Sequence, residues 1–473
     1  METIRKGSEI ELQVEKLAFG GQAVARVEGF VVFIDHALPG QRVRARIVRK
    51  KRQYAEAQVV EVLSQSPHYV EPRCPHFSYC GGCKWQDLSY EQQLHWKRIH
   101  VLECIEHLAG VEEAVVSPVV PSPEVWYYRN KMEFTFSSRR WLLPEEIASG
   151  ADFDRSLALG LHVQGFFDKI FDVQSCFLES PQAVEILRET REWCKASGLA
   201  PYAIRDHLGY WRFLVIREGK RTGQTLVHLL TSGQQHDDAT IERLAAHLGE
   251  RFPAISTFVH SISGKKAQVA TGELSRAVTG PGYIEEKLGD LRFRISPHSF
   301  FQTNPLGAEK LYETVKRFGD FTGSETVWDL YCGTGSIALF IASAVKRVVG
   351  FEVVQDAVDD AYVNCELNGV KNCDFLAGDL KDVIREARDS SRFGSAPDIV
   401  VTDPPRAGMH PNVVKVLLEL APRRIVYVSC NPSTLARDVA ALLGDYEVQA
   451  IQPFDLFPHT PHIECVVRLE RRP

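Results

Sequence analysis

The sequence predicts a multidomain fold with a small N-terminal β-barrel, a central mixed α+β region and a C-terminal α/β domain. At 473 residues the chain is longer than one hydrophobic core usually organises. Residues 7–63 alternate apolar and polar side chains between Gly and Pro turns, a pattern typical of a small antiparallel barrel. After about residue 295, apolar strands alternate with amphipathic helices, which predicts a parallel sheet covered on both faces.

These changes of pattern divide the chain into three expected segments, residues 1–65, 66–295 and 296–473. A helix is expected over residues 90–109 and could pack on the C-terminal domain, whereas the pattern of residues 185–290 leaves their topology open. The composition, 44% hydrophobic and 25% charged, is that of a globular protein, and no apolar run is long enough to span a membrane. The charged N-terminus does not resemble a signal peptide, so we expect a cytoplasmic protein and, by default, a monomer.

The net charge of −6 gives no global indication of nucleic-acid binding, so evidence for such binding has to come from local clusters of basic residues. One strand, beginning at residue 42, places basic side chains on one face and apolar side chains on the other. This pattern indicates either a phosphate-binding surface or an edge strand charged to prevent pairing. The basic residues of this candidate RNA surface are Arg42, Arg44, Arg46, Arg49, Lys50, Lys51 and Arg52.

The eleven cysteines are expected to be reduced thiols, because nothing in the sequence indicates export. Cys74, Cys80 and Cys83 form a C-x5-C-x2-C pattern, and Cys176 is the best candidate for a fourth ligand. Four thiolates can hold zinc or an iron–sulfur cluster. His76 offers a competing zinc arrangement, and a chance cluster is the remaining alternative.

A Gly-rich turn in the C-terminal domain joins a strand to a helix, with Gly333 and Gly335 following Asp329 in a D-x-x-x-G-x-G spacing. Small glycines let a ligand lie against the backbone, and the absence of G-x-G-x-x-G disfavours a dinucleotide. The spacing is that of an S-adenosylmethionine turn. Acids also end the following strands, where ligands bind in parallel sheets. We expect Glu352 to accept the ribose hydroxyls and Asp379 to accept the adenine amino group, with Asp403 at the next strand end.

Two further features indicate the chemistry. Asp403 begins a D-P-P-R turn, and Arg406 stands where DNA amino-methylating enzymes carry an aromatic residue, which disfavours amine methylation. Cys430 ends a buried strand and precedes a helix, whose N-terminus lowers the pKa of a thiol, although a buried core cysteine is the plain alternative. A thiolate that adds to carbon 6 of uracil activates carbon 5 for methylation, and a base must then remove the carbon 5 proton. Glu464 is the candidate base.

From Gln302 to the C-terminus the chain resembles the RNA uracil-5 methyltransferase family, with SFFQTN, DLYCGTGSI, GFE, GD, DPPRAG, YVSCNP and HIECV in order. The resemblance implies a Rossmann-like methyltransferase domain that binds S-adenosylmethionine, Cys430 as the nucleophile and Glu464 as the general base. Ser336 stands where relatives often have Asn. The resemblance also implies residues around the cofactor and the target base, with Asp403 positioning the uracil: Gln302, Tyr331, Gly333, Gly335, Ser336, Glu352, Asp379 and Asp403.

The N-terminal segment, with VEKLAFGGQAVAR and ALPGQRVRARI, resembles the TRAM domain, an OB-like RNA-binding barrel. The same cysteine spacing occurs in the 23S rRNA branch of the family, which carries a [4Fe–4S] cluster on four cysteines, so the resemblance favours that cluster and rRNA as the substrate. It also implies that Arg129, Asn130 and Lys131 lie near RNA. A tRNA uracil-5 methyltransferase, an RNA cytosine-5 methyltransferase and a non-catalytic RNA-binding or assembly protein stay open as alternatives.

Overall fold

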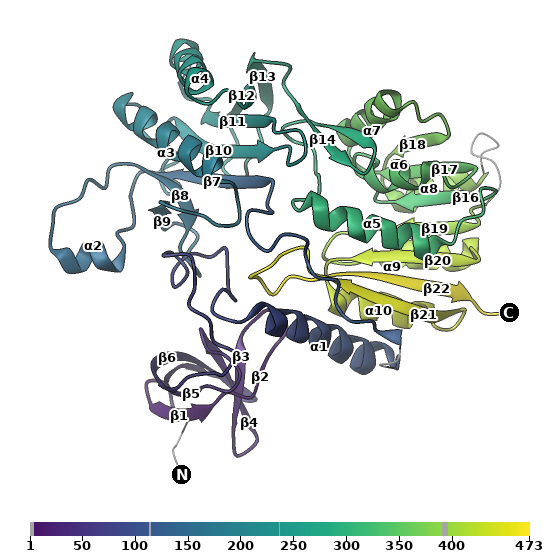
Figure 1. The fold of residues 1–473 in the computed structure, drawn as a ribbon, viewed down its shortest axis with the longest axis horizontal. Coiled ribbons are helices and arrows are strands. Elements are labelled where there is room, and N and C mark those ends of the chain that lie inside the picture. The colour runs from purple at the N-terminus through teal and green to yellow at the C-terminus, as the bar shows by residue number, and fades with distance from the viewer. Residues whose placement is uncertain (1–3, 113–114, 236, 390–395) are drawn as a thin grey trace.

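The computed structural model describes residues 4–112, 115–235, 237–389 and 396–473. Three bodies follow one another along the chain, a purple N-terminal body, a blue to teal central body and a green to yellow C-terminal body (Figure 1). None of the helices within these ranges is both long and apolar enough to cross a lipid bilayer.

The N-terminal body is a six-stranded sheet in the order β1-β5-β6-β4-β3-β2. Alternation sorts its side chains, so that Ile10 and Leu12 of the first strand face the core while their neighbours face solvent. The β4–β6 pair is parallel, which differs from the all-antiparallel expectation. The strands are β1 (Glu9–Gln13), β2 (Lys16–Leu17), β3 (Ala23–Val27), β4 (Phe30–Asp35), β5 (Arg42–Lys50) and β6 (Tyr54–Ser64).

Helix α1 (Tyr90–Ala109) occupies the range expected from the sequence and ends at Gly110, which adopts a left-handed conformation with φ of 66°. It lies along the C-terminal body beside α10 and β21 (Figure 1). Val101, Leu102 and Ile105 join the core of that body. The helix therefore packs a segment from the first quarter of the chain against the C-terminal body.

The central body is a seven-stranded mixed sheet in the order β13-β12-β11-β10-β7-β8-β9. The interior strands β10 and β11 are buried along their whole length. Their sequences therefore lack the alternation of apolar and polar residues that marks a half-exposed strand. The strands are β7 (Lys131–Ser137), β8 (Ala158–His162), β9 (Ile170–Asp172), β10 (Trp211–Glu218), β11 (Thr225–Ser232), β12 (Ile255–Ser263) and β13 (Leu274–Thr279), and the helices are α2 (Pro144–Ser149), α3 (Pro181–Ala196) and α4 (Asp238–Arg251).

A hairpin of β14 (Ile284–Leu288) and β15 (Leu291–Ile295) follows the central sheet. Although it falls within residues 66–295, its apolar side chains, among them Phe293, pack into the core of the C-terminal body. This core also receives α5 (Pro305–Gly319), a helix that the sequence expectations did not include. Asn304 caps that helix and Pro305 begins it, which is the signal that could have identified it.

The C-terminal body is a seven-stranded sheet in the order β18-β17-β16-β19-β20-β22-β21, parallel except for the antiparallel strand β22. The expected alternation of strands and helices and the closing strand pair are both confirmed. The strands are β16 (Thr326–Leu330), β17 (Arg347–Glu352), β18 (Cys373–Ala377), β19 (Ile399–Thr402), β20 (Arg424–Ser429), β21 (Tyr446–Phe454) and β22 (Glu464–Arg471), and the further helices are α6 (Ser336–Ala342), α7 (Gln355–Asn368), α8 (Leu380–Asp389), α9 (Pro411–Leu420) and α10 (Pro432–Leu442).

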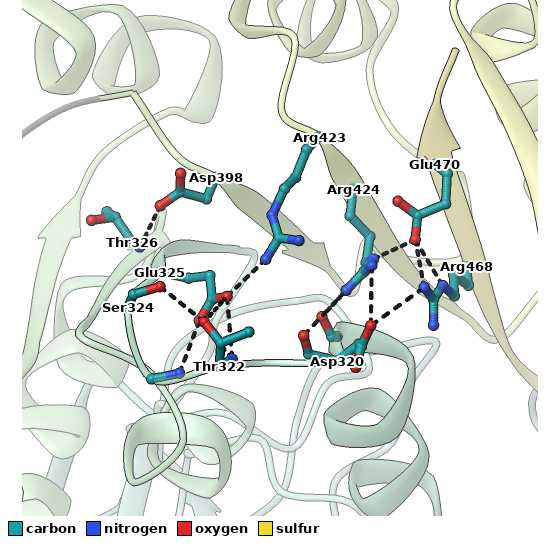
Figure 2. A network of polar contacts seen from close by, with 12 residues as sticks. Asp320, Thr322, Ser324, Glu325, Thr326, Asp398, Arg423, Arg424, Arg468 and Glu470 are labelled. Carbon is teal, nitrogen blue, oxygen red and sulfur yellow. Dashed lines mark hydrogen bonds and ion pairs between the residues drawn. The ribbon is translucent and has the colours of Figure 1, made fainter. Parts of the chain in front are cut away.

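Polar contacts tie together the amino ends of the parallel strands (Figure 2). Glu325, just before β16, accepts hydrogen bonds from Thr322 and from Arg423, whose guanidinium lies 2.7 Å from the carboxylate. Arg424, at the start of β20, bonds to Glu470 of β22 at 2.5 Å. These charges stabilise the edge of the sheet opposite to the one where ligands bind.

Candidate active site

Three chemically reactive side chains meet at the carboxyl edge of the parallel sheet. Asp403 follows β19 and Cys430 follows the adjacent β20. Glu464 begins β22 on the other side of β20, and the pairing of Ser429 with Cys465 places Glu464 next to Cys430 along the edge. Neighbouring strands therefore bring together residues that are separated by up to 61 positions in the sequence.

The electrostatics of this group show that the three side chains influence one another. Burial and, to a smaller extent, the charges of Glu464 and Asp403 raise the pKa of the Cys430 thiol to about 12, while Arg406 opposes them. Burial raises the pKa of Asp403 to about 7. Burial and the charge of Asp403 hold the pKa of Glu464 well above its usual range. At neutral pH the Cys430 side chain is therefore a protonated thiol, and both carboxyl groups hold a proton more tightly than an exposed carboxyl group does.

The D-P-P-R turn is fastened to the turn that carries Cys430. The carbonyl oxygen of Arg406 accepts hydrogen bonds from Asn431 Nδ2 at 3.0 Å and Thr434 Oγ1 at 3.2 Å. A guanidinium nitrogen of Arg406 lies 3.5 Å from His462 Nδ1. In the sequence, Arg406 served only as an argument against amine methylation, whereas in the structure its positive charge lowers the pKa of Cys430. No sequence signal identified His462.

The Gly-rich turn has the open backbone that a ligand needs. Gly333 has a positive φ of 53°, and a side chain there would meet nothing within 4 Å. Gly335 has a φ of 76°, and a Cβ there would crowd Leu339 at 3.0 Å. The Glu352 carboxylate accepts hydrogen bonds from the amide of Gly333 at 3.0 Å and from the amides of Val353 and Val354, which fix the carboxylate at the turn. This open turn with a fixed carboxylate fits the S-adenosylmethionine expected from the sequence.

Asp329 entered the sequence prediction only through its spacing from the glycines of the Gly-rich turn. Its side chain is fully buried and neither oxygen has a hydrogen-bond partner among the described residues. Burial and the nearby charge of Asp403 hold its pKa well above the usual range. Tyr331, two residues later, has a positive φ of 63°, which is uncommon for a non-glycine residue and is found often at ligand-binding turns.

The remaining expected cofactor residues occupy different surroundings. Gln302 is buried, and its carbonyl oxygen accepts a hydrogen bond from Asn130. The hydroxyl of Ser336 lies 3.0 Å from the hydroxyl of Tyr312 on α5, so it already has a partner in the protein. Asp379 is exposed at the start of α8, where its carboxylate lies 3.0 Å from Lys381.

The four cysteines of the predicted cluster line one small cavity between residues 74–86, here named the cysteine segment, and the central body. Burial raises the pKa of each thiol, to about 11 for Cys80 and about 12 for Cys83. A metal would therefore have to displace protons on binding. The described residues contain no group of three or more His, Cys, Asp or Glu side chains already set in metal-binding geometry.

The competing zinc arrangement through His76 does not fit the structure. His76 Nδ1 lies 2.9 Å from the hydroxyl of Tyr79, and its Nε2 accepts the amide of Gln174 at 3.0 Å. Both ring nitrogens are therefore engaged, and the imidazole has no lone pair to offer a metal. The donor set that shares the cavity is four thiols, which fits either an iron–sulfur cluster or zinc.

The structure decides one of the two sequence interpretations of the basic strand β5. It lies between β1 and β6, so the edge-strand interpretation is wrong. The adjacent strands supply glutamates that pair with Arg42, Arg44, Arg46 and Arg49 at 2.5 to 3.4 Å. Lys50 bonds to the carbonyl oxygen of Ile4, whereas Lys51 and Arg52 are exposed in the turn before β6.

The segment at residues 129–131 divides between surface and core. Asn130 is buried and ties the start of β7 to residues 302–303 through 3.1 and 2.8 Å hydrogen bonds, which is a structural contact. Arg129 and Lys131 line a cavity of ≈ 470 Å³ together with the buried Arg217. Burial and the neighbouring arginines lower the pKa of Lys131 despite its ion pair with Glu133.

Comparisons with known proteins agree with this architecture. The sequence model of the tRNA (uracil-5-)-methyltransferase family matches residues 268–472, and that of the TRAM domain matches residues 5–60. An uncharacterised RNA methyltransferase of Chlorobaculum tepidum is 43% identical over 99% of this chain and 97% of its own length. One from Nitratidesulfovibrio vulgaris is 40% identical over 100% of this chain and 98% of its own.

Among solved structures, the tRNA (uracil-54, C5)-methyltransferase of Pyrococcus abyssi, in complex with S-adenosyl-L-homocysteine, is similar at a TM-score of 0.75 and 28% identity, covering 97% of this chain and 100% of that one. The recognition of the family and of the N-terminal TRAM domain is therefore confirmed. With its S-adenosylmethionine-type turn and the reactive edge beside it, the chain belongs to the RNA uracil-5 methyltransferase family and is an S-adenosylmethionine-dependent RNA methyltransferase.

Proposed function

We propose that the enzyme acts in the cytoplasm as a monomer and methylates carbon 5 of one uridine in 23S rRNA through a covalent bond between Cys430 and carbon 6. The observation that carries the proposal is the convergence of Cys430, Asp403 and Glu464 on one sheet edge. A thiol, a group to hold the ring and a base are the parts that this reaction requires.

The chemistry follows from these side chains. S-adenosylmethionine supplies an electrophilic methyl group when bound. Cys430 gives up its proton, which Asp403 can accept because its pKa lies near 7, and the sulfur bonds to carbon 6. The displaced electron pair makes carbon 5 nucleophilic, so that carbon 5 would accept the methyl group and S-adenosylhomocysteine would be left as the neutral thioether. The Glu464 carboxylate then removes the carbon 5 proton, the double bond re-forms and the sulfur leaves.

The residues proposed around the cofactor are those of the Gly-rich turn and its neighbours. Glu352 would hold the ribose hydroxyls, Asp379 the adenine amino group, and Gln302 and Tyr331 the region between cofactor and base. Arg129, Lys131 and the exposed basic residues at the β5–β6 turn would contact RNA, because cations in clefts and on exposed turns favour phosphates. We further propose a [4Fe–4S] cluster on Cys74, Cys80, Cys83 and Cys176, supported by the cavity that they share.

The preference for rRNA rests on the TRAM domain combined with the cysteine pattern. A second candidate substrate is tRNA, since the similar Pyrococcus abyssi enzyme is a tRNA (uracil-54, C5)-methyltransferase. A strain without this gene distinguishes them. We expect one uridine of 23S rRNA to lose its 5-methyl group, whereas loss of 5-methyluridine from tRNA alone would assign the tRNA substrate.

Cys430→Ala tests the covalent route. The variant is expected to lose methyl transfer by a factor of at least about 10³ while binding S-adenosylmethionine with unchanged affinity, because the thiol does not line the Gly-rich turn. Digestion of labelled RNA should yield 5-methyluridine from the wild-type enzyme. Recovery of 5-methylcytidine would assign the cytosine-5 reaction, and full activity of the variant would contradict a covalent role for Cys430.

A further inference from the structure

The loop between β21 and β22, residues 455–463, leads directly into Glu464, the general base of the proposed reaction. Phe454 pairs with Glu464 across the last rung of this antiparallel pair, so Glu464 lies where the regular ladder stops and the loop begins. A terminal rung frays unless the adjoining loop is held. What holds this loop therefore decides how firmly the Glu464 carboxylate is placed.

The first attachment of the loop is a buried ion pair with α1. Lys97 Nζ lies 2.5 Å from Asp455 Oδ1, and both side chains are fully buried. The same ammonium donates to the carbonyl oxygen of Phe457 at 3.1 Å. A buried ammonium is tolerated only with such partners, so the ion pair pins the start of the loop to the helix.

The second attachment encloses His459, which lies five residues before Glu464. Its φ of 67° is uncommon for a non-glycine residue and persists only where the surroundings impose it. The ring stacks on Trp126, with centroids 3.8 Å apart and planes 23° apart. Gln93 accepts the His459 amide at 2.8 Å and lies 3.3 Å from His459 Nδ1.

The third attachment comes from the cysteine segment. The amides of Lys84 and Trp85, directly after Cys83, both donate to the carbonyl oxygen of His459, at 2.9 and 3.0 Å. The hydroxyl of Tyr128 donates to the carbonyl oxygen of Pro458 at 3.1 Å. Side chains and amides from α1, the cysteine segment and residues 126–128 thus converge on four of the five residues 455–459.

We propose that these contacts form a clamp on His459 whose function is to place Glu464 for removal of the carbon 5 proton, with Trp126 and Gln93 as positioning residues. The inference rests on the proposed covalent reaction. It assigns the clamp to the elimination step, because Cys430 and Asp403 follow β20 and β19 and lie outside the clamped residues 455–459. The clamp also links the cysteine segment to catalysis without any electron transfer.

Two RNA substrates separate positioning from general structural damage. On RNA that carries 5-fluorouridine at the target, the adduct forms and is methylated but cannot eliminate, since fluorine does not leave as a cation. Its rate of formation therefore reports on Cys430 and not on Glu464. On ordinary RNA, slow proton removal leaves the methylated covalent adduct to accumulate, which a denaturing gel detects.

The test variants are Trp126→Ala and His459→Gly, with Trp126→Phe as the conservative form that retains a stacking ring. We expect adduct formation on 5-fluorouridine RNA and the KM for RNA to stay within about twofold of wild type. Elimination on ordinary RNA should slow by about tenfold to a hundredfold, with visible adduct, because small displacements of a catalytic group have effects of this size. Trp126→Phe should recover most of the rate.

Trp193→Ala is the matched control, since Trp193 stacks on His247 in the central body, with centroids 4.8 Å apart, away from the loop. It should leave elimination unchanged. The inference would be overturned if the clamp variants lost adduct formation on 5-fluorouridine RNA and elimination on ordinary RNA by equal factors, or if their elimination rate were unchanged. If wild-type enzyme forms no adduct on 5-fluorouridine RNA, the proposed covalent reaction fails instead, which is a different result.

Discussion

Cys430 is a protonated thiol in the unliganded site, because burial and two neighbouring carboxyl groups oppose its ionisation. The positive charge of Arg406 works in the other direction. The covalent reaction proposed for Cys430 therefore requires that substrate binding lower the pKa of this thiol. We therefore expect the Cys430 thiolate to form in the complex with RNA and not in the free enzyme.

Substitutions around Cys430 should alter its reactivity in opposite directions. Asp403→Asn removes a negative charge, so the thiol pKa should fall, and alkylation of Cys430 by iodoacetamide at about pH 8.5 should be severalfold faster. Arg406→Gln should slow it. Because Asp403 itself titrates near 7, the Asp403→Asn effect should vanish at about pH 6, where the wild-type carboxyl is already neutral. Mass spectrometry of the labelled peptide gives the rates, and equal rates at both pH values would argue against this coupling.

Glu464→Gln should trap the enzyme on its RNA, since a glutamine amide cannot accept the carbon 5 proton while Cys430 can still add. A denaturing gel should show a covalent protein–RNA band that survives boiling. The exposed Glu447 of β21 offers a control, and Glu447→Gln should turn over normally without such a band. A Glu464→Gln enzyme that turns over normally would contradict the assignment of the base.

At the scale of elements, the strands of the C-terminal sheet explain why the site was predictable. Parallel strands end at one edge, so a motif at the end of each strand implies that the motifs meet. The Gly-rich turn, Glu352, Asp403 and Cys430 all follow this rule. The clamp does not, because it joins α1 to a loop more than 350 residues later, as the hydrogen bond from Gln93 to His459 shows.

The metal bound by the cysteine segment can be identified by a chemical test. Anaerobically purified wild-type protein should be brown through thiolate-to-iron absorption, and Cys80→Ser should lose this colour because one of four ligands is gone. Cys104→Ser, outside the cavity, and His76→Asn, whose ring nitrogens are otherwise engaged, should keep it. A colourless wild-type protein with stoichiometric zinc would reverse the assignment.

At the scale of the whole molecule, the N-terminal sheet shows how ion pairs between strands neutralise basic residues that look unpaired in the sequence. Seven basic residues in a short stretch suggest a strong phosphate surface, but four of them face glutamates on neighbouring strands. Exposed ion pairs of this kind contribute little to stability and can exchange partners when phosphate arrives. The most available cations are therefore those of the turn before β6.

Neutralising that turn should change how RNA binding depends on salt. Replacing Lys51 and Arg52 with Gln should weaken RNA binding and reduce the slope of log K against log salt by roughly 1.4 to 1.8, the effect of losing two phosphate contacts. Methyl transfer at saturating RNA should not change. The exposed Lys310 and Lys316 of α5 offer a matched pair, and the same replacements there should leave the slope unchanged. An unaltered slope in the first variant would remove the turn from the RNA surface.

The sequence by itself determined the family, the TRAM domain, the α/β sheet and the strand-end residues, because short motifs and hydrophobic periodicity are local properties of the chain. Only the tertiary structure decided that β5 is an interior strand neutralised by its neighbours, that His76 is already engaged and that Arg406 lies near Cys430. It also revealed the clamp on the loop before Glu464. These facts depend on contacts between segments far apart in the sequence, and no local pattern encodes which distant side chain will supply a hydrogen bond or an opposite charge.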